Sequence, residues 1–352
     1  MHGRIRYAAP TAVLLEGARL LFPGYFALVM ATGVISIACH LLGMRPVALL
    51  LVAFNWIAYP CLWLLTLIRI VRFPALLMRD VFDHEQAPGF FTLVAGTCVL
   101  GTQNMIVLEA RGVAVALWWL GVGLWFVVMY AFFTAVTVRP RKPALARGIN
   151  GAWLIASVAT QSIVVLRAVI DTGVPPHPAF QFQAVAMFMI GSMLYLAIIP
   201  LIFYRMTFVV LPHEEFSPPY WINMGAVAIS ALAGALLLLR ADVWPVVAPL
   251  VPFIRGLTFF FWATATWWIP FLFALMIWRY GWKHDRFAYE PSVWGMVFPL
   301  GMYTTSTLQF DRAMGYGFLD PVPGTIVFIA LAAWLLAAIG LVRRLARIAT
   351  PA

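Results

Sequence analysis

Long runs of apolar residues alternate with short polar or basic segments along nearly the whole chain. A helix that crosses the ~30 Å hydrocarbon core of a bilayer needs about 20 apolar residues. Runs of at least about this length lie at 22–43, 46–70, 88–108, 112–138, 148–170, 180–210, 220–239, 253–278, 291–310 and 321–345. The pattern predicts an all-α integral membrane protein with ten transmembrane helices, in a single transmembrane domain over residues 1–352.

The composition agrees with this pattern. The 352 residues are 64% hydrophobic and only 10% charged, with a mean hydropathy of +0.94, whereas about a quarter of a soluble domain is charged. These values exclude a cytosolic enzyme, a secreted disulfide scaffold and a single-pass receptor. The first run resembles a signal peptide, but it is too long and has no A-x-A exit site, so we expect a mature span.

The basic residues indicate the orientation of the chain. Of the 23 Lys and Arg residues, 17 lie in flanks that ten spans place on the same side as both termini, and 6 lie on the other side. By the positive-inside rule, both short termini are predicted to be cytoplasmic, in a bacterial inner (plasma) membrane. The net charge of +10 therefore reflects topology. Because aromatic residues do not interleave the basic clusters, no nucleic-acid partner is expected.

The odd-numbered runs begin in similar ways and recur about every 60–70 residues, which is the length of one helix pair. We take the glycines of these starts as repeat positions: Gly24, Gly89, Gly151, Gly225 and Gly295. Repeats of helix pairs are common in transporters. The sequence thus predicts five helical hairpins.

The two limbs of each hairpin differ in composition. Odd runs hold 20 uncharged polar residues and three tryptophans, whereas even runs hold 12 and ten. Bulky aromatics suit lipid, and small hydroxylated residues suit helix packing or a wet path, so five inner helices should be surrounded by five outer ones. The predicted pore-lining residues are Thr32, Ser36, Thr97, Thr102, Ser157, Thr160, Ser230, Thr304 and Thr305. The alternative is that these hydroxyls only join helices or bond to their own helical turn.

Candidate chemistry is sparse. No Asp, Glu, Lys or Arg lies near the middle of a run, although ion-coupled carriers usually need such groups there. An uncharged path below a basic rim favours anions over cations. Cys39, Cys61 and Cys98 lack CxxC spacing and are expected to be small buried hydrophobes. His84, within Asp83-His84-Glu85, is predicted to be a solvated loop residue, the alternative being a pH sensor at the pore mouth. We predict no metal, cofactor or catalytic residue, and no enzyme.

The ninth run reads Trp294-Gly295-Met296-Val297-Phe298-Pro299-Leu300-Gly301. Together with five helix pairs and the Pro23-Gly24-Tyr25-Phe26 start, it resembles the tellurite-resistance/C4-dicarboxylate transporter (TDT) family over about residues 22–345. That family includes the yeast malate permease, fungal sulfite efflux pumps and plant slow anion channels.

The resemblance implies a quasi-fivefold protomer around a central pore, usually in a homotrimer, with Phe298 as the pore gate beside the helix-kinking Pro299. It also implies that small anions are the transported partners, in contact with membrane lipid. Among the possible functions, transport of C4-dicarboxylates or transport related to tellurite resistance is the first candidate. A sulfite, halide or nitrate channel or exporter is the alternative, and a cation or metal exporter or a membrane enzyme acting on lipid or quinone is less favoured.

Overall fold

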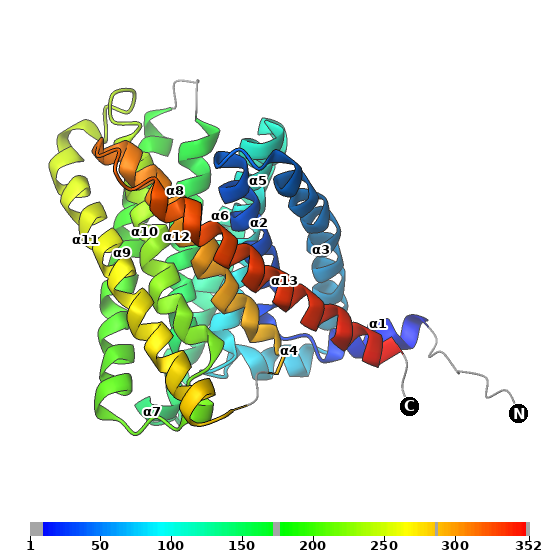
Figure 1. Cartoon of the computed structure of the whole chain (residues 1–352). Coiled ribbons are helices and arrows are strands. Elements are labelled where there is room, and N and C mark those ends of the chain that lie inside the picture. The colour runs from blue at the N-terminus through cyan, green and yellow to red at the C-terminus, as the bar shows by residue number, and fades with distance from the viewer. Residues whose placement is uncertain (1–9, 172–176, 286–287, 350–352) are drawn as a thin grey trace, which may run out of the picture.

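The computed structural model describes residues 10–171, 177–285 and 288–349, which are helical and contain no β-strand (Figure 1). Within these ranges, nine helices are long and apolar enough to cross a membrane. The predicted all-helical, multi-pass membrane fold is confirmed. The ninth predicted span, α12 (Trp294–Met314), is long but less apolar, because it contains Thr304-Thr305-Ser306-Thr307 as well as Asp311.

Five long helices are buried, and they follow the odd-numbered predicted spans. They are α2 (Ala27–Leu41), α5 (Phe91–Leu108), α8 (Ile155–Ile170), α10 (Ile222–Leu238) and α12. We call them the inner helices. α2 packs against α5, α5 against α8, α8 against α10, α10 against α12, and α12 against α2, so their contacts close a ring.

A 3₁₀ turn precedes every inner helix. These turns are η1 (Pro23–Phe26), η2 (Ala87–Phe90), η3 (Gly151–Leu154), η5 (Pro218–Trp221) and η8 (Pro291–Val293). Proline occupies the first or second position of four of them, where its fixed φ suits a helix start and its missing N–H is not needed. In η3 the Asn150 side chain instead accepts a hydrogen bond from the Ala152 N–H at 2.9 Å, as an N-cap. The five turns also contact one another in a ring.

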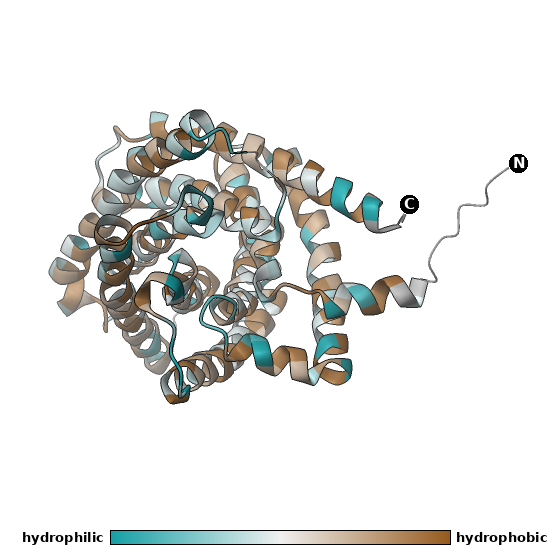
Figure 2. Ribbon diagram, turned by 90° about the horizontal axis from the view of Figure 1, so that it is seen from below, coloured by the Kyte–Doolittle hydropathy of each residue, from teal (hydrophilic) through white to brown (hydrophobic). Residues whose placement is uncertain are grey.

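Five longer helices surround the inner ones and follow the even-numbered predicted spans. They are α3 (Arg45–Arg72), α6 (Arg111–Val138), α9 (Pro178–Phe208), α11 (Val251–Met276) and α13 (Pro321–Ala349). We call them the outer helices. In their most apolar stretches at most 50% of residues are buried, against at least 83% in α2, α5, α8 and α10. Seen end-on, apolar residues colour much of the rim (Figure 2), as expected of a lipid-facing surface.

Several short helices connect the long ones and were not predicted from the sequence. They are α1 (Pro10–Arg19), α4 (Pro74–Val81), α7 (Leu145–Gly148), η4 (His213–Glu215), η6 (Ala248–Leu250) and the π-turn η7 (Ile277–Trp282). The prediction for cysteine was partly wrong. Cys39 and Cys98 are buried, but Cys61 is exposed because it lies on the outward side of α3.

Candidate functional site

Two cavities lie among the inner helices. The larger, which we call the wide cavity, has a volume of about 480 Å³ and opens at the helix ends that carry the 3₁₀ turns. Polar side chains line its mouth: Glu85, Gln86, Asn150, Ser217, Glu290, Ser292 and Arg344. The N-terminal ends of all five inner helices therefore face one space, and helix N-termini carry partial positive charge.

The second space, which we call the narrow cavity, has a volume of about 50 Å³ and lies toward the other ends of the same five helices. Its lining contains only uncharged residues, most of them Val, Ile and Leu. A buried water needs about 10–15 Å³ of such volume, so the narrow cavity has room for a few waters.

The two linings follow one register in all five inner helices. The wide cavity includes Ala27, Thr92, Ile155, Ile222 and Gly295. The narrow cavity includes the residues seven positions later: Val34, Val99, Ser162, Ile229 and Met302. Seven residues are two helical turns, so equivalent positions face the same side. Matching positions of the five inner helices thus face the same central axis.

Phe298 lies between the two cavities in this register. Residues three positions after the wide-cavity set also face the axis, and they are Met30, Ala95, Val158, Gly225 and Phe298. Phe298 is the one aromatic residue of this layer; it lines neither cavity and is 1% exposed. Among the described residues it makes no recorded ring–ring contact, unlike Phe310 of the same helix, which stacks on Trp262 at 4.8 Å.

Pro299 packs directly against a glycine of the neighbouring helix. A Cβ added to Gly225 of α10 would lie 2.7 Å from Pro299 Cγ, closer than real Cβ contacts allow. Pro299 also removes a backbone donor from the interior of α12. The Gly225–Pro299 contact therefore fixes the backbone next to Phe298.

The structure separates the predicted pore-lining hydroxyls into groups. Thr102 and Thr305 line the narrow cavity, as does Ser162, which was not among the predicted lining residues. Ser230 and Thr304 bond to their own helical turns through Ala226 O and Leu300 O and line neither cavity.

The other five hydroxyls bond to outer helices, which is the packing role that the sequence left open. Trp334 Nε1 donates to Thr32 at 2.8 Å, and Trp125 Nε1 donates to Thr160 at 2.8 Å. The remaining contacts are Ser36 to Ala48 O, Tyr59 with Thr97, and Ser157 to Gly191 O. These five residues line neither cavity, because they point to polar partners on the outer helices.

The predicted repeat glycines do not occupy equivalent positions. In the register of the cavities, Gly24 and Gly89 match each other, and their counterparts are Ala152, Pro219 and Ser292. Gly151, Gly225 and Gly295 lie one position before, six after and three after the matching site. Gly89 and Gly151 are still required, because an added Cβ would lie 2.7 Å from Gly24 N and 2.0 Å from Pro219 O.

A second repeated feature was missed in the sequence. Four outer helices have an arginine at or just after their C-terminal end that bonds to a backbone carbonyl in the segment leading into the inner helix of the same hairpin. The contacts are Arg69 to Ala18 O and Arg19 O, Arg139 to Phe82 O, Arg205 to Ile149 O, and Arg279 to Phe216 O. We call these the arginine clamps. The distance from the start of the inner helix to the arginine varies between hairpins, so the sequence showed only the charge of these residues.

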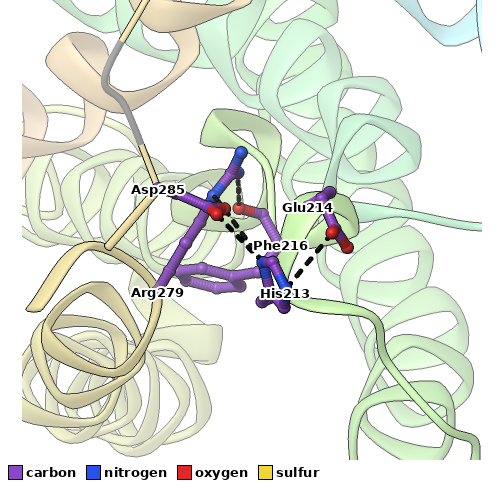
Figure 3. Close-up of polar contacts among 5 residues, drawn as sticks. All are labelled: His213, Glu214, Phe216, Arg279 and Asp285. Carbon is purple, nitrogen blue, oxygen red and sulfur yellow. Dashed lines mark hydrogen bonds and ion pairs between the residues drawn. The ribbon is translucent and has the colours of Figure 1, made fainter. Parts of the chain in front are cut away.

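Figure 3 shows the Arg279 clamp, which lies in the π-turn η7. Arg279 Nε donates to Asp285 Oδ2 at 3.0 Å, and His213 Nδ1 lies 3.1 Å from the same carboxylate. Glu214 pairs with the other ring nitrogen of His213 at 3.2 Å. The hydrogen bonds from His213 and Arg279 hold the pKa of Asp285 below its usual value.

His84 belongs to the Arg139 clamp and is buried, so its prediction as a solvated residue was wrong. Its Nδ1 lies 3.2 Å from Arg139 Nη1, and its carbonyl accepts a hydrogen bond from Trp153 Nε1 at 3.0 Å. Burial, with the positive charge of Arg139, lowers the pKa of His84. Within the described ranges, no group of three His, Cys, Asp or Glu residues is placed to hold a metal ion.

An all-helical membrane fold with cavities at both ends of a five-helix bundle defines a multi-pass membrane protein of the channel or transporter class. Residues 21–342 match the family model described as SLAC1, voltage-dependent anion channel. The chain belongs to this family, and the resemblance inferred from the sequence is confirmed.

The matches to individual relatives cover between 44% and 89% of the chain. Two uncharacterized transporters of Methanocaldococcus jannaschii are each 23% identical to it, over 88% and 89% of this chain and 91% and 90% of their own lengths. An uncharacterized membrane protein of Mycobacterium tuberculosis is 33% identical over 44% of this chain and 77% of its own length. The named transporters agree with a role in membrane transport.

Proposed function

We propose that the chain conducts small anions along the axis of the inner helices and that Phe298 closes this path. In this proposal, ten helices cross the membrane as five hairpins with quasi-fivefold symmetry, within one domain over residues 1–352. Membership of the anion-channel family supports it. The observation that supports it is that the two cavities follow one register along the inner helices and are separate from each other, with Phe298 in the layer between them.

Electrostatics favour an anion. The narrow cavity has no carboxylate in its lining, and cation channels usually have rings of carboxylates. At the wide cavity, five helix N-termini add partial positive charge. Among the described lining residues, Arg344 adds a positive charge there, and Glu85 and Glu290 add negative charges, so the preference for an anion rests on the narrow cavity and the helix N-termini.

The leading substrates are C4-dicarboxylates of the malate type or tellurite-related anions, on the basis of the family resemblance. Sulfite, halide or nitrate is the second candidate, and the small narrow cavity favours it because a compact anion needs less widening. A liposome flux panel of malate, succinate, sulfite, nitrate and chloride at two pH values distinguishes the two candidates.

The proposed setting is a bacterial inner membrane, with both termini in the cytoplasm and the wide cavity on that side. The helix directions put the excess of basic residues on the side of the wide cavity, as the positive-inside rule requires. A homotrimer is proposed from the family resemblance.

Replacement of the phenyl ring tests the gate. In Phe298→Ala the ring that separates the cavities is removed, so anion flux into liposomes should rise about tenfold or more, because a plug blocks by size and by dewetting. The assay measures anion-dependent flux by a fluorescent reporter or by current across a planar bilayer.

Phe310→Ala is the matched control. It removes the same ring from the same helix, but Phe310 stacks on Trp262 of α11, away from the layer between the cavities. This variant should lose stability without a rise in flux. If flux through Phe298→Ala equals the wild-type value in folded protein, Phe298 does not close the path.

A further inference from the structure

A cavity larger than either of these two opens on the side of the molecule, between α1, α3 and α13. We call it the lateral groove; its volume is about 590 Å³. Most of its lining is apolar: Gly17, Leu20, Leu21, Leu28, Phe54, Ile57, Ala58, Leu62, Leu65, Leu341 and Leu345, with Tyr25 and Cys61. The charged lining residues are Glu16 and Arg344.

Both charged residues mark the end of the groove that lies on the wide-cavity side of the molecule. Glu16 is in α1 and pairs with Arg19 at 3.1 Å, whereas Arg344 is in the last turns of α13. The apolar wall extends away from this end along α3, from Leu65 to Phe54, whereas the lining residues of α13 all lie within one turn of Arg344. The lateral groove is thus an amphiphilic site, with the Arg344 cation at one end and apolar side chains along its length.

Arg344 differs from the corresponding arginines of the other outer helices. Arg69, Arg139, Arg205 and Arg279 each bond to a backbone carbonyl. Arg344 occupies the similar place on the fifth outer helix, yet within the described residues it has no hydrogen bond or ion pair recorded. Its charge interacts with the phenols of Tyr25 and Tyr289, but among the described residues no carboxylate or carbonyl is recorded within bonding distance. Since Arg344 is half-buried, its guanidinium loses part of its hydration, which is unfavourable unless an anion binds there.

The lateral groove and the wide cavity share a wall. Leu20 and Arg344 line both, so a group bound to Arg344 in the groove lies at the edge of the space that an anion would enter.

We propose that the lateral groove binds an anionic phospholipid, with an acyl chain along α3 and the phosphate on Arg344 of α13. The groove opens toward the surface that bears the exposed apolar residues of the outer helices, where acyl chains are the surrounding solvent. Among its described lining residues, the charged group without a recorded ion pair is Arg344. It lies at the helix ends rich in arginine, which attract anionic headgroups. The phosphate thus takes the place that a backbone carbonyl has in the other four clamps.

The test uses full-length protein in detergent with added phosphatidylglycerol or phosphatidylcholine. Native mass spectrometry counts retained lipid, and the rate of N-ethylmaleimide modification reports occupancy of the groove. Cys61 is a built-in probe for this, because it lines the groove and is exposed while Cys39 and Cys98 are buried.

Phosphatidylglycerol is expected to be retained by the wild type and to slow modification of Cys61 by about fivefold or more, as one arginine contact to an anionic lipid allows. Arg344→Ala should abolish both effects. The matched control is Arg343→Ala, which removes the same charge from an exposed neighbour that does not line the groove; it should behave as the wild type.

Three results would overturn the proposal. Equal retention of phosphatidylglycerol by Arg344→Ala and the wild type would show that Arg344 does not hold the lipid. Equal protection of Cys61 by phosphatidylcholine would show a generic apolar surface. Protection that follows protein concentration in place of lipid would show that a second copy of the chain covers the groove. The Phe298 experiment does not depend on any of these results, so the anion path and the lipid site fail separately.

Discussion

The hydroxyl groups in the narrow cavity already donate their only protons. Thr102 donates to Cys98 O at 3.0 Å and Thr305 donates to Gly301 O at 3.2 Å, each four residues back along its helix. Ser162 does the same toward Ala159 O at 2.7 Å. An anion in this cavity therefore meets oxygen lone pairs and methyl groups, and it gains no hydroxyl donor unless an internal bond breaks.

This arrangement predicts that Thr305→Val has little effect on transport. The substitution keeps the shape and removes a hydroxyl that is not available to an anion, so flux should stay within about twofold of wild type. The liposome flux assay measures it, with Phe298→Ala as the positive control. A large fall in flux would show that the Thr305 hydroxyl turns to donate to the passing anion.

His84 shows what the sequence could not give at the residue scale. A histidine between Asp83 and Glu85 is typical of a solvated loop, but the folded chain places it under Trp153 and against Arg139. Arg139 is distant in sequence, so no local pattern reveals the contact. The acceptor role of Nδ1 requires the neutral ring.

His84 should therefore make the protein sensitive to acid. Because its pKa is lowered in the folded state, the unfolded chain binds more protons as the pH falls below about 6.5, the ordinary histidine value. Stability from this group is complete above that pH and decreases below it, toward the lower folded pKa. The nearby charges that contribute are Arg139, Asp83 and Lys142.

Thermal unfolding in detergent between pH 7 and pH 5 tests this effect. His84→Gln should lose less stability over that range than the wild type. The exposed His284→Gln should keep the wild-type pH dependence. Identical slopes for His84→Gln and the wild type would refute a role for this ring.

At the scale of elements, hydropathy predicted the long helices well. Within the described residues, each of the ten apolar runs corresponds to a long helix, with ends that differ by a few residues, such as 180–210 against Pro178–Phe208. The signal is strong because every backbone group in lipid must bond within its own segment. Short helices such as α1 and α4 were missed because their sequences are neither long nor apolar enough to stand out.

The repeat was found, but its register was not. Glycines near the helix starts were taken as equivalent. The equivalent feature is instead a 3₁₀ turn with Pro in its first or second position, or with Gly151 after the Asn150 cap. Different residues thus form the same 3₁₀ turn at the start of the inner helix in different hairpins. Register therefore depends on which positions face the axis, and that information comes from packing.

The arginine clamps are a property of helix ends, and Arg205 provides a test of them. Arg205 is buried and bonds to Ile149 O and to Glu215 at 2.8 Å. Arg205→Ala should cost about 2–3 kcal/mol of stability, because a hydrogen bond to a charged group is lost and a carbonyl is left unpaired.

Unfolding in detergent by heat or denaturant gives the measurement for Arg205→Ala. The exposed Arg141→Ala removes one positive charge from the same side of the molecule and should stay within about 0.5 kcal/mol of wild type. Equal losses in the two variants would mean that net charge, and not the clamp, accounts for the effect.

For the whole molecule, composition predicted which helices are inside. Tryptophan-rich segments form the exposed outer helices, and hydroxyl-rich segments form the buried inner ones. The direction in which the hydroxyls point could not be predicted, because both a seam between helices and a pore wall favour small polar residues. For Thr160 and Thr32 the structure gives the direction: the indoles of Trp125 and Trp334 on the outer helices donate hydrogen bonds to them.

The charge asymmetry predicts the topology. Alkaline phosphatase fused after Asp242, in the segment between α10 and α11, should be active because this segment lies on the side with few basic residues. The same enzyme fused after Pro143, between α6 and α8, or at the C-terminus should be inactive, and green fluorescent protein there should fluoresce. The reverse pattern would invert the proposed orientation.

The hydrogen bonds between inner and outer helices restrict the motions by which the proposed anion path could open. Indole and phenol donors join Thr32, Thr97 and Thr160 to their outer partners, and Gly225 fits against Pro299 without spare room. Tilting an inner helix would break several of these contacts at once, whereas turning one side chain about χ1 breaks none of them. We therefore expect conduction to switch when the Phe298 side chain changes its χ1 rotamer while the surrounding helices stay in place. The rate of opening should then be set by rotation about one bond, and not by a concerted tilt of the inner helices.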